Sequence, residues 1–305
     1  MMTPLTSGIS YFDLDFQGMS RVIATVVLVG KSGVAIIDPG PSSALGGLEA
    51  TLQRAGLLMS DVNAVLLTHI HLDHAGAAGT LVRKNPKLKV YVHEKGAPHM
   101  SNPEKLLASA SRLYGDAMDR LWGEVKSVPE DALVVLKGGE RLEQGGRQLD
   151  VLYTPGHASH HVSYFADDAG IAFVGDTAGV KVLPNGAVLL PTPPPDIDLG
   201  LWEQSLAQIE AWRAETLFLT HFGPSSQPAL HLSELRDNLQ LAQRLVKDSL
   251  RREGTDADRE NWFAEQVRRD LRQRMSESDA KVYEVAGRFD LNWRGLARYL
   301  RKRAA

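Results

Sequence analysis

Short apolar runs alternate with amphipathic stretches along the first 220 residues. β-Branched runs at Val22–Val29 and Val34–Ile37 flank a glycine-containing turn, which predicts two adjacent strands. Similar runs predict strands at Val65–Thr68, Lys89–His93, Leu133–Leu136, Leu149–Tyr153, Val162–Phe165, Ile171–Val174 and Thr216–Thr220. Helical patterns at Ser42–Gly56 and Trp202–Arg213 interleave with them. This interleaving favours an α/β fold in layers over a sandwich of sheets alone or a helical bundle.

A helical insertion is expected at about residues 98–128. Met118, Leu121 and Trp122 fall on one helical face there, with Leu113 and Tyr114 one turn earlier. The ordinary interpretation is a stripe that packs on the body of the protein. The alternative is a lid whose side chains face an apolar substrate.

The chain ends in a further helical region from Leu230 on. Leucines between Leu232 and Leu245 form a stripe at helical spacing, and two more helical stretches follow. We therefore expect a main domain at 1–229, which contains the insertion, and a C-terminal helical extension at 230–305. The extension could cover a sheet edge, complete a substrate pocket or form a homodimer interface.

Composition narrows the class of protein. Hydrophobic residues make up 43% and charged residues 23% of the 305 residues, which excludes a disordered or fibrous chain. There is no apolar run near the roughly 20 residues of a membrane-spanning helix and no secretory signal at the start, so we expect a cytoplasmic protein without a membrane partner. Residues 231–305 hold 17 basic and 13 acidic residues. That balance is typical of a charged helical face, and we expect no nucleic-acid partner.

Cysteine is absent, whereas histidine occurs ten times. The chain therefore has no disulfide, no thiolate nucleophile and no cysteine-containing zinc site. Any metal must be held by histidines and carboxylates.

Four side chains able to bind a metal follow one predicted strand within six residues: His69, His71, Asp73 and His74. His69 and His71 alternate, so an extended loop would point both to one side. Asp73 and His74 are adjacent and would point apart, which suits a second metal beside the first. This spacing at a strand end indicates a metal site rather than ordinary surface histidines.

Three distant segments add one further group each. His157 follows a strand in a Pro-Gly turn, Asp176 follows a buried apolar strand, and His221 follows another. A buried carboxylate without a partner would be costly, so Asp176 needs a cation nearby. Four strand ends thus each deliver a metal-binding group, as expected for a site built on rigid elements.

The order H-x-H-x-D-H, then His, Asp and His, resembles the metallo-β-lactamase superfamily over roughly residues 8–225. The resemblance implies a four-layer αβ/βα sandwich with metals at one edge of two facing sheets. It implies these ligands: His69, His71 and His157 for the first metal, Asp73, His74 and His221 for the second, and Asp176 bridging both. Asp38 and His161 match residues that support the ligands from behind.

The resemblance also implies a reaction. An aspartate at position 176 and the lack of cysteine make the chain more similar to the glyoxalase II, lactonase and phosphodiesterase branches than to the true lactamases. We expect a binuclear hydrolase of an ester, thioester or lactone, in which a metal-bridging hydroxide attacks and Asp73 orients it and carries its proton. The expected cofactors are two divalent ions, zinc first and iron or manganese as alternatives. The expected partner is a small-molecule substrate.

Other functions remain open within the same fold. One is a mononuclear iron enzyme similar to persulfide dioxygenases, and another is a phosphodiesterase or nuclease. A non-enzymatic binding module would be expected to lack ligands that this chain keeps. For His93, His99, His160 and His231 we expect structural or solvated positions.

Overall fold

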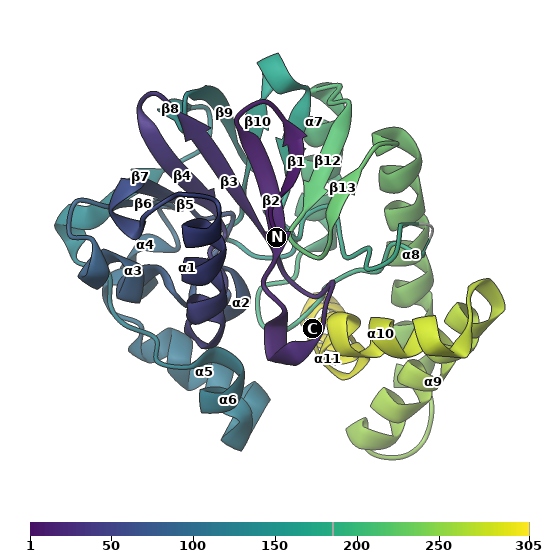
Figure 1. Ribbon diagram of the computed structural model, residues 1–305. Coiled ribbons are helices and arrows are strands. Elements are labelled where there is room, and N and C mark those ends of the chain that lie inside the picture. The colour runs from purple at the N-terminus through teal and green to yellow at the C-terminus, as the bar shows by residue number, and fades with distance from the viewer. Residues whose placement is uncertain (185, 305) are drawn as a thin grey trace.

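Two β-sheets face each other at the centre of the protein (Figure 1), whose computed structural model describes residues 1–184 and 186–304. The larger sheet has the order β1-β2-β3-β4-β5-β6-β7 and the smaller one the order β13-β12-β11-β10-β9-β8. The larger sheet consists of β1 (Thr3–Thr6), β2 (Ile9–Asp13), β3 (Ala24–Gly30), β4 (Gly33–Ile37), β5 (Val62–Leu66), β6 (Lys89–His93) and β7 (Leu133–Leu136). The smaller sheet consists of β8 (Arg141–Gln144), β9 (Arg147–Tyr153), β10 (Val162–Ala166), β11 (Ile171–Phe173), β12 (Thr216–Leu219) and β13 (Gly223–Ser225).

Both faces of the central strands are apolar, as the continuous β-branched runs predict. On β3, Val26 and Leu28 pack against the other sheet, together with Tyr164 and Phe173. Val27, between them, points to the opposite face and joins the core under the outer helices. Side chains of a strand alternate between its two faces, so a strand buried on both must be apolar throughout.

Helices cover the outer face of each sheet, and α5, α6, α9 and α10 lie beyond the sheets (Figure 1). The helices of the described residues are α1 (Leu45–Arg54), α2 (Leu72–Ala75), α3 (Ala78–Lys84), α4 (Ala97–Ser101), α5 (Glu104–Tyr114), α6 (Met118–Trp122), α7 (Leu199–Ala211), α8 (Pro228–Leu250), α9 (Asp256–Arg274), α10 (Glu277–Gly287) and α11 (Phe289–Ala304). Residues of α1 and α3 share one core with the larger sheet, and residues of α7 and α8 share another with the smaller sheet. The result is the expected four-layer αβ/βα sandwich, with a helical insertion (α4 to α6) and a C-terminal helical extension.

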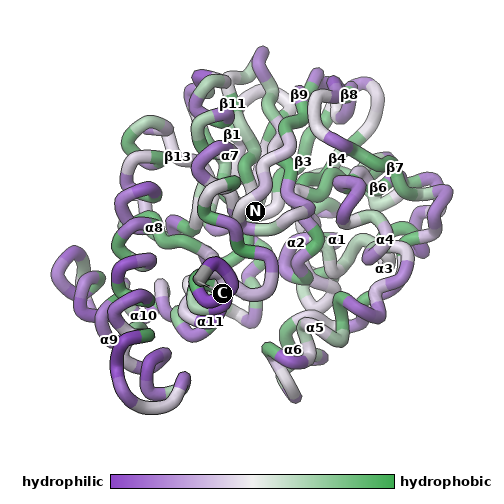
Figure 2. Tube along the Cα trace, turned by 180° about the vertical axis from the view of Figure 1, so that it is seen from behind, coloured by the Kyte–Doolittle hydropathy of each residue, from purple (hydrophilic) through white to green (hydrophobic). Residues whose placement is uncertain are grey.

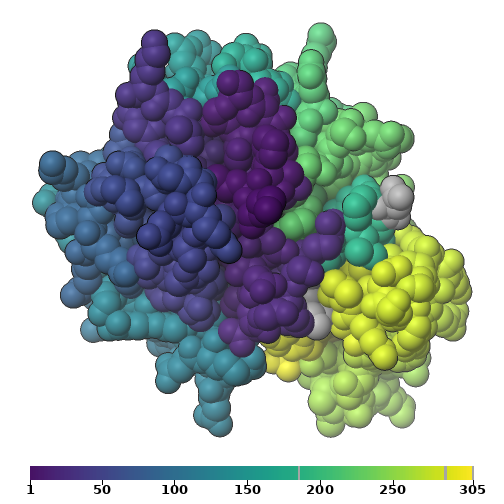
Figure 3. All heavy atoms as spheres, viewed as in Figure 1, coloured from purple at the N-terminus to yellow at the C-terminus, as the bar shows by residue number. Residues whose placement is uncertain are grey.

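The C-terminal helices are attached to the smaller sheet rather than standing apart. Leu232 and Leu235 of α8 and Trp293 of α11 lie in the same buried core as Trp202 of α7. The outer helices α9 and α10 carry many hydrophilic positions (Figure 2). In Figure 3 the segment between β2 and β3 lies between the α5–α6 insertion and the C-terminal helices. Among the described residues, no helix is both long and apolar enough to cross a bilayer.

Several elements differ from the prediction. Strands β1, β2, β8 and β13 and helices α3 and α10 were not predicted. Strands β1, β8 and β13 have only three or four residues with few apolar positions, too short to show an apolar period. The expected extended loop through His74 is wrong beyond His71. A short helix, α2, begins at Leu72, and the His71 carbonyl accepts from the His74 and Ala75 amides at 3.0 and 2.9 Å.

Candidate metal centre

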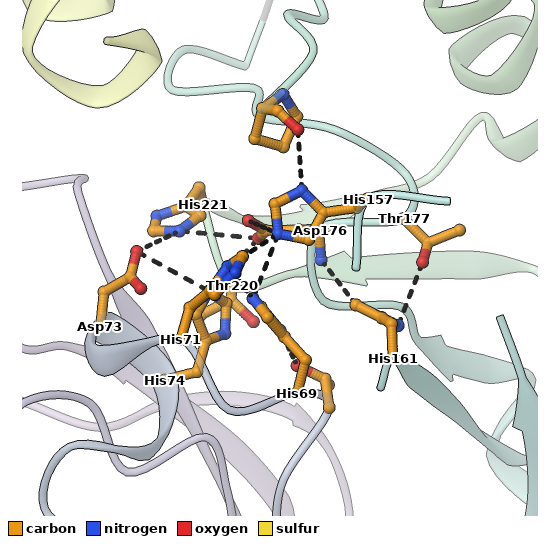
Figure 4. A network of polar contacts seen from close by, with 12 residues as sticks. His69, His71, Asp73, His74, His157, His161, Asp176, Thr177, Thr220 and His221 are labelled. Carbon is orange, nitrogen blue, oxygen red and sulfur yellow. Dashed lines mark hydrogen bonds and ion pairs between the residues drawn. The ribbon is translucent and has the colours of Figure 1, made fainter. Parts of the chain in front are cut away.

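The side chains able to bind metal gather at one edge of the two sheets (Figure 4). Strands β4, β5 and β6 run parallel, as do β11 and β12, and β9 has the same direction as β11 because both are antiparallel to β10. The residues that follow the carboxyl ends of these strands therefore meet at the same edge. All seven expected ligands lie there: His69, His71, Asp73, His74, His157, Asp176 and His221.

Three ring nitrogens form a first group. His71 Nδ1 lies 2.9 Å from His69 Nε2 and 3.0 Å from His157 Nε2, and these two Nε2 atoms are 3.3 Å apart. His69 and His157 are almost fully buried. This is the group expected to hold the first metal.

Hydrogen bonds behind the rings determine which nitrogens carry protons. His157 Nδ1 donates to the Pro191 carbonyl at 2.7 Å. Thr68 Oγ donates to Asp38 at 2.7 Å, so Thr68 Oγ must accept from His69 Nδ1 at 3.1 Å. The Nε2 lone pairs of His69 and His157 therefore point to the centre of the group. Neutral imidazoles with free lone pairs are what a divalent metal requires.

A second group surrounds Asp176. Its Oδ1 lies 3.4 Å from His74 Nε2 and 3.6 Å from His221 Nε2, whereas its Oδ2 lies 3.4 Å from His157 Nε2 of the first group. Asp73 Oδ2 is 3.4 Å from His221 Nε2. The two oxygens of Asp176 thus face two different sets of nitrogen donors.

Two buried polar atoms in this second group are orphaned. Among the described residues, His74 Nε2 and Asp176 Oδ1 make no hydrogen bond, although they are only 3.4 Å apart. Unpaired buried polar atoms are costly. A divalent cation between them would satisfy both, so these donors fit the metals that the family pattern implies.

Asp38 fixes the second group from behind. Its Oδ2 accepts from His74 Nδ1 at 2.8 Å and from Thr220 Oγ at 2.9 Å, and its Oδ1 accepts from the Thr68 amide at 2.8 Å. Asp38 is 1% exposed. It thereby joins the ends of β4, β5 and β12 and orients His74. The two threonines were not singled out from the sequence, although both directly precede a ligand histidine.

His161 lies behind Asp176 and outside the ligand groups. Its Nε2 accepts from the Asp176 amide at 3.2 Å, and its Nδ1 bonds Thr154 Oγ at 2.9 Å. Gly175 precedes Asp176 with a left-handed φ of 47°, and a Cβ there would lie 2.6 Å from His161 Nε2. Only glycine fits this tight turn, which aims Asp176 at the nitrogens.

The electrostatics of the two groups differ. Burial and then neighbouring imidazoles hold the pKa of His69 well below its usual range, and the pKa of His71 is lowered to about 4 by burial and then His157. Burial opposes charge on His74 too, but Asp176, Asp38 and Asp73 raise its pKa well above the usual value. The first group therefore presents neutral donors, and the second presents carboxylates.

A cavity of about 300 Å³ opens onto the metal centre. The insertion supplies one wall with Leu113, Tyr114 and Trp122, and the C-terminal extension supplies another with Arg288 and Leu291. The Arg288 guanidinium lies 5.4 Å from the centre of the Tyr114 ring, so the two walls meet. The extension thus completes the pocket, one of the three roles left open by the sequence.

The insertion packs on the body of the protein, as in the ordinary interpretation, and it also lines the cavity. Met118 and Leu121 pack against the core of the larger sheet. Leu113, Tyr114 and Trp122 line the cavity. Tyr114 and Trp122 also contact that core, so the same side chains help to anchor the segment and to form the cavity wall.

The remaining histidines divide into two kinds. His93 stacks on Tyr153, and His231 Nε2 donates to the Ala178 carbonyl at 2.7 Å, so both are structural as expected. His99 and His160 line the cavity, which the sequence did not indicate. His160 comes three residues after the ligand His157, and only that proximity could have signalled its position.

Comparison with known proteins identifies the family. A family model described as the metallo-β-lactamase superfamily matches residues 20–221. The metallo-β-lactamase fold-containing protein ST1585 of Sulfurisphaera tokodaii is 31% identical over 219 residues, which cover 70% of this chain and 78% of that protein. The chain belongs to the metallo-β-lactamase superfamily, and it is a metallo-hydrolase of that superfamily.

Other relatives match in sequence or in fold. The hydroxyacylglutathione hydrolase of Synechococcus sp. (strain JA-2-3B'a(2-13)) is 29% identical, but the match covers 47% of this chain and only 43% of that protein. The metallo-β-lactamase family protein TTHA1429 of Thermus thermophilus has a TM-score of 0.74 over 99% of this chain and 96% of that one, at 24% identity. A di-iron form of TTHA1623 has a TM-score of 0.54 over 70% of this chain and 93% of that one, at 26% identity.

Proposed function

We propose that this protein is a dinuclear metal-dependent hydrolase of ester, thioester or lactone bonds. The observation that carries the proposal is Asp176, whose Oδ2 faces His157 and whose Oδ1 faces His74, both at 3.4 Å. A carboxylate with one oxygen toward each donor group favours two cations side by side. His69, His71 and His157 would hold one of them, and Asp73, His74 and His221 the other.

The chain's own residues prepare the reaction in a defined way. When bound, the two ions supply a hydroxide at neutral pH and polarise the carbonyl of the substrate. Asp73, with a side chain 27% exposed at the cavity, is placed to accept a hydrogen bond from the attacking water and to hold its proton. The apolar side chains of Leu113, Trp122 and Leu291 exclude bulk water from the reacting bond.

The donor set and the relatives also suggest which metals and which kind of substrate the protein binds. We propose zinc, because histidines and carboxylates are its usual ligands where cysteine is absent. Iron is the leading alternative, since TTHA1623 has a di-iron form. We propose a small molecule as substrate and the cytoplasm as location. The hydroxyacylglutathione hydrolases among the relatives support a thioester, and the cavity volume is within the range typical of small-molecule sites.

The test combines metal analysis with a substrate panel. We expect about two metal equivalents per chain and turnover of lactones or thioesters but not phosphodiesters. A single iron with oxygen uptake would overturn the proposal in favour of a dioxygenase. Turnover of phosphodiesters alone would overturn it in favour of a phosphodiesterase.

A further inference from the structure

One side of the cavity is lined by polar side chains that are not expected metal ligands. Lys95, Ser159, His160 and Asp196 line it next to the first histidine group. Lys95 follows β6, and Ser159 and His160 belong to the turn that carries His157. None of these four belongs to the seven expected ligands.

Lys95 is held in place. Its Nζ donates to the Tyr153 hydroxyl at 2.7 Å, and that hydroxyl donates to the Ser159 carbonyl at 2.9 Å. The Tyr153 ring in turn stacks on His93, with ring centres 4.3 Å apart and planes 4° from parallel. The ammonium of Lys95, an exposed residue at the cavity, is therefore tethered beside the peptide that leads into His160, and two of its three N–H donors remain without a protein partner among the described residues.

His160 presents a further donor. The Ile70 amide donates to His160 Nδ1 at 3.4 Å, which makes Nδ1 the acceptor and leaves the proton of the neutral ring on Nε2. The ring lies nearly parallel to that of His69, with centres 6.1 Å apart, and is 8% exposed. Its remaining edge faces the cavity.

The carboxylate on this side is already bonded. Asp196 Oδ2 accepts from Ser159 Oγ at 2.6 Å. Lys105, an exposed residue on α5, adds a second positive charge to the lining. The two lysines carry two positive charges and Asp196 carries one negative charge, so these three residues leave a net positive charge beside the imidazole donor. This balance favours a negatively charged group, because charge-assisted hydrogen bonds are stronger than neutral ones.

We propose that Lys95 and His160 form a subsite for a carboxylate or phosphate group of the substrate. The apolar wall around Leu113 and Leu291 then takes the acyl chain. This inference rests on the proposed hydrolase function and narrows it. The preferred substrates are acyl thioesters or esters whose thiol or alcohol part carries a negative charge.

Matched thioesters test the subsite. S-hexanoyl-3-mercaptopropionate carries a carboxylate, and S-hexanoyl-3-mercaptopropionamide is its neutral counterpart. S-hexanoyl-4′-phosphopantetheine carries a phosphate, and S-hexanoylpantetheine is its neutral counterpart. In the better pair we expect the KM of the anionic substrate to be about tenfold below that of its neutral counterpart. The larger of the two KM ratios tells which group the subsite prefers.

Variants locate the effect. Lys95→Met should remove most of the KM preference for the anionic substrate, His160→Phe should reduce it, and His160→Gln, which keeps a donor, should retain more of it. Lys87→Met, an exposed lysine in the turn before β6, is the control and should leave the preference unchanged. Calorimetry with the non-hydrolysable 3-(hexylthio)propionate should show the same order in affinity.

The outcomes separate the subsite from the hydrolase function. Equal KM values for charged and neutral thioesters, or equal increases for both in Lys95→Met, would refute the subsite and leave the hydrolase intact. If the metal-loaded protein hydrolysed no ester, thioester or lactone, the proposed function would fail. The calorimetric comparison of wild type with Lys95→Met would then still decide on the subsite: equal affinities would refute it.

Discussion

The metal centre and the cavity above it are built by different means. The expected ligands come at or just after strand ends, and hydrogen bonds from behind hold most of their rings, as Pro191 holds His157 and Asp38 holds His74. The apolar walls of the cavity come instead mainly from helices in two distant segments, the insertion and the C-terminal extension. These walls meet at Arg288 and Tyr114.

This difference in construction separates metal binding from substrate selection. A site anchored in a core of two packed sheets keeps its geometry, because rigid elements position its groups. Walls made by added helices can change without disturbing the ligands. We therefore expect variants at the sheet edge to alter metal binding, and variants in the walls to alter which substrate is used.

The largest effect should follow from Asp176→Ala. Removing the carboxylate that faces both donor groups should leave at most one bound metal and lower kcat/KM by about a thousandfold or more. Asp196→Ala, a cavity carboxylate outside the ligand groups, is the control and should keep two metals. Metal analysis and initial rates give the answer. Unchanged metal content in Asp176→Ala would be incompatible with the bridging role.

Asp38→Ala tests the support behind the centre. His74 Nδ1 and two threonine hydroxyls would lose their acceptor. We expect the free energy of unfolding to fall by about 3–5 kcal/mol and the metal affinity to drop about 10- to 100-fold. Denaturant unfolding and metal titration measure both effects. The exposed Asp237→Ala is the control, and equal behaviour of the two variants would contradict the role of Asp38.

A substitution of His231 tests the contact between helix α8 and the turn at Ala178. Burial, partly offset by the bond to Ala178, lowers the pKa of His231 to about 4. In the unfolded chain His231 becomes protonated below about pH 6.5, whereas in the folded chain it stays neutral down to about pH 4. The free energy of unfolding therefore falls as the pH drops from about 6.5 to about 4. Between pH 7 and pH 5 the titration of His231 should lower the free energy of unfolding by about 2 kcal/mol. His231→Gln keeps a donor toward Ala178 and should remove this part of the pH dependence. Denaturant unfolding of the metal-saturated proteins at both pH values is the measurement, and parallel curves for the two proteins would contradict the prediction.

Leu113→Asn should have the smallest effect, confined to the wall. Leu113 lines the cavity from α5. A polar side chain there should raise the ratio of the KM for an octanoyl substrate to the KM for a butanoyl substrate about three- to tenfold relative to the wild type. Metal content should stay at two. Leu230→Asn, at a position 66% exposed on α8, is the control. Loss of metal in Leu113→Asn would break the separation between wall and centre.

The same contrast explains which parts of the fold and of the site could be predicted from the sequence. Asp176 and His221 each follow a buried apolar run, so their position at a strand end is a local property that the sequence predicts. The partners of Asp38 are not local, since Thr220 lies far along the chain and reaches it only through the fold. Helix α2 is four residues long, too short to show a period. The meeting of Tyr114 with Arg288 depends on how two separate helical segments pack, which no pattern within either segment encodes.

Stepwise zinc titration of the metal-free protein tests the central claim most directly. Bound metal and the rate of thioester or lactone hydrolysis are followed together, with oxygen uptake as a parallel readout. We predict that two equivalents bind and that hydrolysis rises until both are in place. Full activity at one equivalent, or oxygen uptake with a single iron and no hydrolysis at any zinc loading, would contradict the dinuclear hydrolase.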